Sequence, residues 1–172
     1  LSCAQSQEEL VRPLLEMLQQ VTQLDSTYLT QIDLEQDLQQ VLYACNTQQM
    51  QIPEGLSVQW SDTLCKRALS EGRMCTMNVQ ECWADSQAAQ ALGIRTYVSA
   101  PVRLSDGVVY GTLCAASGNE ASLQPGTEAI LQLFAKLIGQ HVERAILVRQ
   151  LQERNAQLTH LALTDPLTQL PN

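Results

Sequence analysis

A long segment without proline near the carboxyl end constrains the fold more than any other feature of the chain. It lies between Pro125 and Pro166, and Pro125, after Gln124, is a residue that favours the first position of a helix. A helix begun there would run for about 38 residues, roughly 55 Å at 1.5 Å per residue, and Gly139 weakens it only slightly. A domain of this size needs no helix so long, so we expect its distal part to project. Its core-facing side is expected to comprise Ile130, Leu133, Phe134, Leu137, Ile138 and Val142.

The amino end carries a second amphipathic helix. Leucines recur there at helical spacing and predict a helix to about Thr22. Ser6 and Glu9 match the capping box that begins many helices. Because Pro13 conflicts with so early a start, the helix is either kinked at Pro13 or begins near Arg12.

The middle of the chain alternates between strand-like and helical patterns. These predict strands at 28–32 and 38–45, a long loop at 46–60, a short helix capped by Ser61 or Asp62 and ended by Gly72, a strand at 74–79, a short helix capped by Asp85 and ended by Gly93, and strands at 96–103 and 108–116. Asp106-Gly107 between the last two strands is the strongest hairpin signal. This order predicts an α+β fold with one antiparallel sheet of about five or six strands, flanking helices mostly on one face, and a long projecting carboxyl-terminal helix.

Two segments within this pattern are typical of a known family. They are residues 55–72 (GLSVQWSDTLCKRALSEG) and 92–117 (LGIRTYVSAPVRLSDGVVYGTLCAAS), and the most specific part runs from Pro101 to Cys114. Together with the closing helix they resemble the GAF sensory domain family, over about residues 8–145. Gly111, within the most specific part, is suited to let a neighbouring group approach the sheet closely. The resemblance implies the GAF fold.

The final residues, 163–172 (LTDPLTQLPN), carry an independent resemblance. They are similar to the opening of a GGDEF diguanylate cyclase domain, and depart from its usual pattern only at Gln169, where Gly is expected. The W-S-D-T-L-C sequence that begins at Trp60 also looks like GAF domains found just upstream of GGDEF domains in bacteria. The resemblance implies that the catalytic loop and the residues that bind GTP and Mg lie after residue 172. The chain by itself is therefore expected to contain no catalytic residue and not to be an enzyme.

Together the two resemblances imply the regulatory part of a cytoplasmic bacterial diguanylate cyclase. The chain would divide into an N-terminal helix of a dimer bundle (1–25), the GAF domain (26–145), a coiled-coil signalling helix (146–162) and the truncated start of the GGDEF domain (163–172). Such a domain would receive a ligand or redox signal and control cyclic di-GMP synthesis.

The projecting part of the long helix has heptad spacing. Val148, Asn155 and Ala162 fall at position a, and Leu151 and Leu158 at position d. A β-branched residue at a, Leu at d and a single Asn at a favour a parallel two-stranded coiled coil. A parallel homodimer suits a cyclase, because two GGDEF domains must meet to condense two GTP molecules. The alternative is a single solvated helix with a few leucines.

The GAF resemblance also implies a place for a small-molecule ligand, between the sheet and the loops and helices that connect its strands. Aromatic and thiol side chains expected there are Trp60, Cys65, Met74, Cys82, Trp83, Tyr97 and Cys114. They could hold a flat or redox-active ligand, or they could simply fill the space. Cys114, in an apolar strand, is expected to be a small buried hydrophobe. Cys65 lies near a helix start, where the macrodipole lowers the pKa of a thiol modestly.

Composition and motifs exclude several partners and cofactors. The net charge of −8 argues against nucleic acid or an anionic membrane as partner, because both need a basic face. No apolar run of about 18 residues is present to span a membrane. The cysteines form no CxxC pair and no cluster with histidine, so neither a disulfide framework nor a metal site is expected. Neither His141 nor His160 follows a Cys, as a bilin-binding GAF domain would require, and the sequence requires no cofactor.

Two other functions fit parts of the sequence. One is a ligand-free GAF domain that serves only for dimerisation. The other is a methionine sulfoxide reductase on the same fold, for which Cys65, Cys75 and Cys82 would supply thiols. The long helix and the tail at 163–172 disfavour the reductase, since a stand-alone enzyme would need neither.

Overall fold

The computed structural model describes residues 3–163, and residues 1–2 and 164–172 lie outside that description. The predicted start of a GGDEF domain at 163–172 therefore falls, except for Leu163, outside the described residues. The elements in chain order are α1 (Cys3–Thr22), β1 (Ser26–Asp33), β2 (Leu38–Asn46), β3 (Ser57–Gln59), the 3-10 helix η1 (Trp60–Asp62), α2 (Leu64–Glu71), β4 (Cys75–Thr76), α3 (Val79–Cys82), α4 (Gln87–Leu92), β5 (Thr96–Arg103), β6 (Val109–Ser117) and α5 (Thr127–Leu163).

The strands form one six-stranded antiparallel sheet in the order β3-β2-β1-β6-β5-β4. In the centre of the sheet, Tyr28 of β1 is opposite Cys114 of β6, and Thr30 is opposite Thr112. Alternate residues of a strand point to the same face. These four side chains therefore share one face, and the predicted α+β fold with its antiparallel sheet is confirmed.

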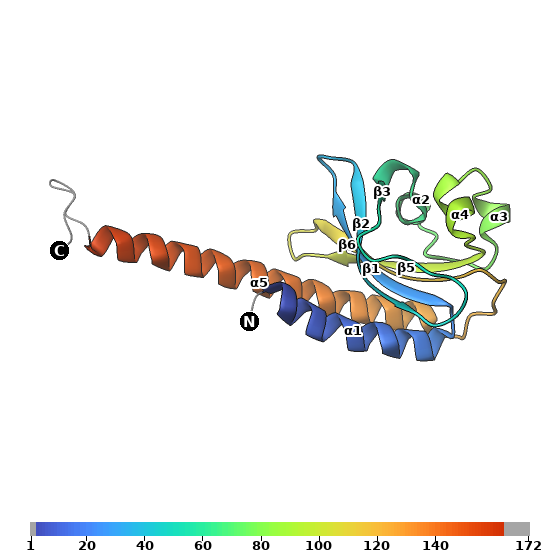
Figure 1. The fold of residues 1–172 in the computed structure, drawn as a ribbon, viewed down its shortest axis with the longest axis horizontal. Coiled ribbons are helices and arrows are strands. Elements are labelled where there is room, and N and C mark those ends of the chain that lie inside the picture. The colour runs from blue at the N-terminus through green and yellow to red at the C-terminus, as the bar shows by residue number, and fades with distance from the viewer. Residues whose placement is uncertain (1–2, 164–172) are drawn as a thin grey trace.

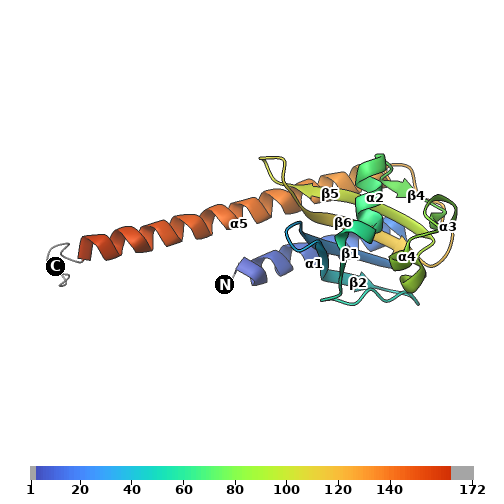
Figure 2. The same cartoon turned by 90° about the horizontal axis from the view of Figure 1, so that it is seen from above.

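Helices cover both faces of this sheet (Figures 1 and 2). The long helices α1 and α5 lie side by side on one face, and the short helices α2, α3 and α4 lie on the other. The sequence predicted helices mostly on one face. This is correct for the two long helices, but the three short helices lie on the opposite face. β5 and β6 are buried at nearly every position, as strands covered on both faces must be. Each face has its own apolar core, one containing Tyr97 and Cys114 and the other containing Val98 and Leu113.

Helix α5 packs on the sheet over its first half and projects beyond it over its second half (Figure 1). It begins at Thr127 rather than at Pro125, because Gly126 has a φ of 88° and belongs to the preceding turn. Leu133 and Leu137, predicted to face the core, are exposed. Ile138 and Val142 are buried as predicted, and the buried side of the helix also comprises Thr127, Leu131, Ala135 and Gly139.

Two glycines allow close approach of the backbone. A Cβ atom added at Gly111 would lie 1.8 Å from the carbonyl oxygen of Thr30, which confirms the close approach predicted at Gly111. A Cβ atom added at Gly139 of α5 would lie 2.5 Å from the carbonyl oxygen of Arg103 at the end of β5. The helix therefore contacts the sheet backbone through a residue that has no side chain.

Several predicted boundaries are corrected by local hydrogen bonds. Thr63, not Ser61 or Asp62, caps α2 by accepting a hydrogen bond from the Lys66 amide, and Ser86, not Asp85, caps α4. The predicted strand at 74–79 is shorter, and its end becomes α3. Part of the predicted loop at 46–60 is β3, which pairs with β2.

The start of α1 also differs from the prediction. The helix begins before Ser6 and continues through Pro13, so Ser6 does not cap it. Among residues 3–163, none of the helices combines the length and the apolar character needed to cross a membrane.

Candidate functional site

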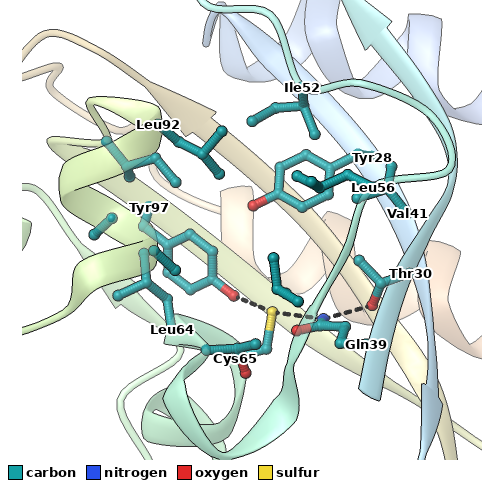
Figure 3. A pocket seen from close by; sticks show the side chains of 15 residues that line it. Tyr28, Thr30, Gln39, Val41, Ile52, Leu56, Leu64, Cys65, Leu92 and Tyr97 are labelled. Carbon is teal, nitrogen blue, oxygen red and sulfur yellow. Dashed lines mark hydrogen bonds between the residues drawn. The ribbon is translucent and has the colours of Figure 1, made fainter.

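A small cavity lies between the sheet and the short helices (Figure 3). Its volume is about 50 Å³. Ile52, Leu56 and Leu92 line one end, while Gln39 and Cys65 lie at the other end. The cavity therefore has an apolar wall and a polar floor.

The register of the central strands determines the polar floor. Thr30 of β1, Thr112 of β6 and Gln39 of β2 converge there, and all three side chains are buried. Gln39 Nε2 lies 2.7 Å from Thr30 Oγ1 and 3.0 Å from Thr112 Oγ1, within hydrogen-bonding distance of both. The two hydroxyls are 2.7 Å apart and also share a hydrogen bond. Helix α2, capped by Thr63, lies above this floor and brings Cys65 onto it.

Cys65 is the centre of the hydrogen-bond network. Its Sγ accepts hydrogen bonds from the Tyr97 hydroxyl at 2.8 Å, from Gln39 Nε2 at 3.1 Å and from Thr112 Oγ1 at 3.2 Å. Cys114 Sγ lies 3.6 Å from Cys65 Sγ. Both thiol residues are buried, with 4% and 0% of their surface exposed. The sequence-predicted thiol Cys65 and the predicted hydrophobe Cys114 are thus neighbours.

The two thiols have opposite pKa shifts. Burial raises the pKa of Cys65, but hydrogen bonds from Cys114, Gln39, Thr112 and Tyr97 outweigh burial and lower the pKa to about 6. Burial raises the pKa of Cys114 well above its ordinary value, and the neighbouring Cys65 raises it further. The arrangement therefore favours a thiolate on Cys65 beside a protonated thiol on Cys114. Hydrogen bonds to the sulfur, rather than the helix macrodipole that the sequence suggested, provide the cause.

Burial also keeps the surrounding hydroxyls protonated. It raises the pKa of Tyr28 and of Tyr97 well above the ordinary value, so the Tyr97 hydroxyl remains a hydrogen-bond donor to Cys65. Ser99, opposite Cys114 in the sheet, has a buried hydroxyl without a hydrogen-bond partner among the described residues.

The other sequence-predicted residues do not line the cavity. Trp83 packs edge-on against Tyr97, with ring centroids 6.3 Å apart, and its indole N–H donates to Glu71. Trp60 belongs to the same apolar core. Met74 is half-buried, and its carbonyl oxygen accepts a hydrogen bond from the Ser99 amide of β5. Cys82 is exposed and accepts a hydrogen bond from Arg73.

Of the predicted set, the structure therefore brings Cys65, Tyr97 and Cys114 together, and only Cys65 and Tyr97 line the cavity. Sequence reasoning missed Tyr28, Thr30, Gln39 and Thr112. The alternation of Tyr28 and Thr30 along β1 was a usable signal, since it places both on one face. Gln39 carried no such signal, because glutamine in a strand is usually exposed.

The thiols expected for a reductase are not assembled. Cys75 packs with the core on the α1 and α5 face, whereas Cys65 packs with the core on the opposite face. Among the described residues, no three His, Cys, Asp or Glu side chains are grouped so that they could hold a metal ion.

The predicted coupling residues lie on the projecting part of α5. Val148, Leu151 and Leu158 are exposed large apolar side chains. Asn155 and Ala162 lie on the same segment of the helix. A single chain leaves this row of side chains facing solvent.

Comparison with known proteins gives consistent matches. The family model of the GAF domain matches residues 6–142. The chain is 49% identical over 168 residues to "Diguanylate cyclase DgcP" of Escherichia coli (strain K12), and the match covers 98% of this chain and 49% of that protein. The chain thus spans about half the length of this relative.

Solved structures agree on the fold. The blue-light absorbing form of the Thermosynechococcus elongatus PixJ GAF-domain matches with a TM-score of 0.71 at 14% identity, over 93% of this chain and 96% of that one. The chromophore-binding domain of a bacteriophytochrome from R. palustris matches with a TM-score of 0.66 at 10% identity, over 79% of this chain and 54% of that one. At such identities the likeness shows the fold alone. A chromophore does not fit the described cavity, because ligand pockets usually have about 300–1,000 Å³.

Proposed function

The chain belongs to the GAF domain family, and on this premise we propose that it is the regulatory domain of a bacterial diguanylate cyclase. In this proposal the domain is a parallel homodimer that receives a ligand or redox signal at the cavity. Helix α5 then transmits the signal to a catalytic domain that makes cyclic di-GMP from GTP with Mg. The observation that carries the proposal is the 49% identity to a diguanylate cyclase over 168 residues.

The sheet provides a physical connection between the cavity and α5. Tyr97 of β5 faces the cavity, and the next residue, Val98, packs in the core under α5. Cys114 of β6 faces the cavity side, and its neighbours Leu113 and Ala115 pack in the other core. Because protein interiors are close-packed, a shift of either strand is felt on both faces. This supports a signal that passes from the cavity through the sheet to the helix.

The outer face of α5 supports the dimer. Leu133 is 54% exposed and Leu151 is 60% exposed. About five full helical turns separate the two residues, so they lie on one face of the helix. Helix α1, which lies beside α5 (Figure 1), also carries exposed apolar residues, Met17 and Val21. A surface of this kind is typical of a protein–protein interface.

The heptad positions support a parallel arrangement. Position d carries Leu151 and Leu158, and position a carries Val148, Asn155 and Ala162. In a parallel pair Asn155 would face its own copy and set the register. Two catalytic domains after residue 172 would then lie next to each other, as a reaction that joins two GTP molecules requires.

Oligomeric state tests the dimer. We expect residues 1–172 to be a dimer by light scattering after size-exclusion chromatography, and Leu151→Glu to convert it to a monomer. The matched control is Gln152→Glu, an exposed residue next to Leu151, which should leave the dimer intact. A monomeric parent protein, or a dimeric Leu151→Glu variant, would refute this part of the proposal.

Helical phase tests the coupling. In a chimera, this chain replaces the matching half of E. coli DgcP, and cyclic di-GMP formation from GTP is measured. Three residues inserted after Leu151 rotate the helix by about 300°, whereas seven residues return it to within about 20° of its original phase. We expect the three-residue insertion to change the activity and the seven-residue insertion to preserve it. Equal activity of both would refute coupling through α5.

Cavity variants separate a sensor from a dimerisation module. Tyr97→Phe removes the hydroxyl that donates to Cys65 and keeps the ring. We expect this variant to change the activity of the chimera or its response to a ligand or oxidant. If every cavity variant behaves like the parent while the three-residue insertion still alters activity, the domain only dimerises the cyclase.

A further inference from the structure

We propose that Cys65 and Cys114 form a peroxide-reactive pair. Hydrogen peroxide enters the cavity and oxidises Cys65, and Cys114 then forms a disulfide with the oxidised Cys65. This inference rests on the proposed function, because it identifies the regulatory signal received at the cavity. It adds a modification site, a chemical class of oxidant and a defined product.

The two sulfurs are already in contact. Cys65 Sγ and Cys114 Sγ are 3.6 Å apart and come from different elements, α2 and β6. A disulfide has an S–S distance of about 2.05 Å, so the sulfurs must approach by roughly 1.5 Å. Side-chain rotation of Cys65 near the start of a short helix can provide part of this movement.

The environment gives the two sulfurs different roles. Tyr97, Gln39 and Thr112 donate hydrogen bonds to Cys65 Sγ, and these bonds stabilise the thiolate, which is the reactive form. Cys114 Sγ lies 3.6 Å from Cys65 Sγ and 3.3 Å from Thr112 Oγ1, so both atoms are acceptors within reach of its single proton, as expected for a protonated thiol. Cys65 is therefore the attacking sulfur and Cys114 the resolving one.

The other described cysteines lack such an arrangement. Burial raises the pKa of Cys45 and of Cys75 above the ordinary value, so both remain thiols at neutral pH. Cys82 is exposed, and no second thiol is in contact with it among the described residues. Among the cysteines that the structure describes, only the Cys65–Cys114 pair combines a stabilised thiolate with a resolving thiol.

The size of the cavity selects the oxidant. A water molecule needs about 10–15 Å³ of such space, and the cavity has about 50 Å³. Hydrogen peroxide, with two heavy atoms, fits this volume, whereas a fatty-acid hydroperoxide or a flat aromatic ligand does not. Ala89 and Ile94 also line a larger outer hollow between α3 and α4, so the cavity adjoins a space through which peroxide can approach.

The reaction balances in two steps. First, the Cys65 thiolate attacks one oxygen of hydrogen peroxide. The S–O bond forms, the O–O bond breaks, and the departing hydroxide takes a proton from solvent to become water. Second, Cys114 Sγ attacks Cys65 Sγ, the S–S bond forms, and the S–O bond breaks. The departing hydroxide takes the Cys114 proton, so two sulfurs lose two electrons and peroxide becomes two waters.

The disulfide would alter the centre of the sheet. It removes the anionic acceptor of the Tyr97, Gln39 and Thr112 hydrogen bonds, so these side chains must find new partners. It also ties α2 to β6. Leu113 and Ala115 of β6 pack in the core that α5 covers, which connects the oxidation to the helix.

Mass spectrometry of residues 1–172 treated with hydrogen peroxide tests the chemistry. We expect the loss of two hydrogen atoms from each chain, and a Cys65–Cys114 cross-link in a non-reducing peptide digest. Reduction with dithiothreitol should reverse both. In the Cys114→Ser variant, dimedone should trap a sulfenic acid on Cys65, and the matched Cys82→Ser variant should behave like the parent protein.

The rate provides a second criterion. At neutral pH a thiol with a pKa of about 6 has a thiolate fraction about 100-fold larger than one with a pKa of about 9. Its lower intrinsic nucleophilicity reduces this advantage, so a net gain of about fivefold over an ordinary thiol is expected. In the Cys114→Ser variant, where no thiol resolves the sulfenic acid, dimedone labelling of Cys65 should be faster than that of Cys45 and Cys75 by at least this factor, because burial raises the pKa of both.

Two results would overturn the inference. One is a cross-link that joins any other pair of cysteines. The other is an unreacted Cys65 in folded parent protein under conditions that oxidise Cys82. These readouts use no cyclase activity. If they fail while the three-residue insertion after Leu151 still alters the chimera, the peroxide inference falls and the regulatory proposal stands.

Discussion

Replacement of Gly139 by Ala is the sharpest test of how α5 is seated on the sheet. Helix propensity alone predicts that Gly139→Ala stabilises the protein by about 1 kcal/mol, because Ala is the better helix former. The structure predicts the opposite sign. The new Cβ atom would lie 2.5 Å from the carbonyl oxygen of Arg103 and 3.6 Å from Val102 Cγ1, and the first distance is too short.

The size of the effect follows from that contact. To reach 3.4 Å, an ordinary van der Waals distance, the helix must retreat from β5 by about 0.9 Å. A gap of that size removes roughly a quarter to a half of the dispersion energy of each separated pair of atoms. Overpacking of this kind usually costs about 1–3 kcal/mol. After the gain of about 1 kcal/mol in helix propensity, we expect a net loss of up to about 2 kcal/mol in the free energy of unfolding.

Urea unfolding followed by circular dichroism measures this quantity. The matched control is Gln140, which is the next residue and is exposed. The variants Gln140→Ala and Gln140→Gly should differ by about 1 kcal/mol in favour of Ala. The Ala–Gly difference should have the opposite sign at residue 139. If Ala is favoured equally at both residues, the close contact between α5 and Arg103 is wrong.

Three other predictions concern stability. Gly111→Ala would place a Cβ atom 1.8 Å from the Thr30 carbonyl oxygen. Because that oxygen belongs to the backbone of a paired central strand and cannot move aside freely, we expect a loss of about 3 kcal/mol or more. A loss within about 1 kcal/mol in urea unfolding would contradict this prediction. The pKa of Cys65 is about 6 in the folded protein and about 9 when unfolded, so the unfolded state binds more protons between these values. Stability should therefore rise with pH over that range, by at most about 1.4 kcal/mol per pH unit, and Cys65→Ala should flatten the rise in a pH series of unfolding curves. Glu54→Gln should lower the free energy of unfolding by no more than about 1 kcal/mol, because the side chains of the Arg12–Glu54 ion pair are 40% and 42% exposed. A larger loss that persists in high salt would show that this ion pair does not behave as a solvent-exposed one.

The sequence predicted most elements because their signals are local. The hairpin at Asp106-Gly107, the helix ends at Gly72 and Gly93, and the long segment after Pro125 each depend on residues close together in the chain. The predicted capping residues lie one or two positions before Thr63 and one position before Ser86. Neighbouring Ser, Thr and Asp residues offer equivalent caps, and only the direction of the adjoining backbone selects one.

The site was predicted less well. Cys65, Tyr97 and Cys114 were chosen as aromatic or thiol side chains in a GAF-like segment, and they do meet. Gln39 and Thr112 were missed, because nothing in the local sequence marks a buried amide or hydroxyl. Their burial follows from strand register, which pairs residues that are far apart in the chain.

The long helix shows the division between sequence and tertiary structure most clearly. The sequence by itself determined that a helix follows the turn at Pro125, that it outruns its domain, and that its far end carries heptads. These properties depend on helical propensity and period, which are encoded within a few residues. Only the tertiary structure decided which side of α5 meets the sheet. Leu133 and Leu137 have the apolar character of core residues, yet Gly139 allows the opposite side to approach Arg103 and leaves both leucines exposed. The distance of closest approach between two backbones decides the orientation of the helix, and this distance has no counterpart in the hydrophobicity of the chain.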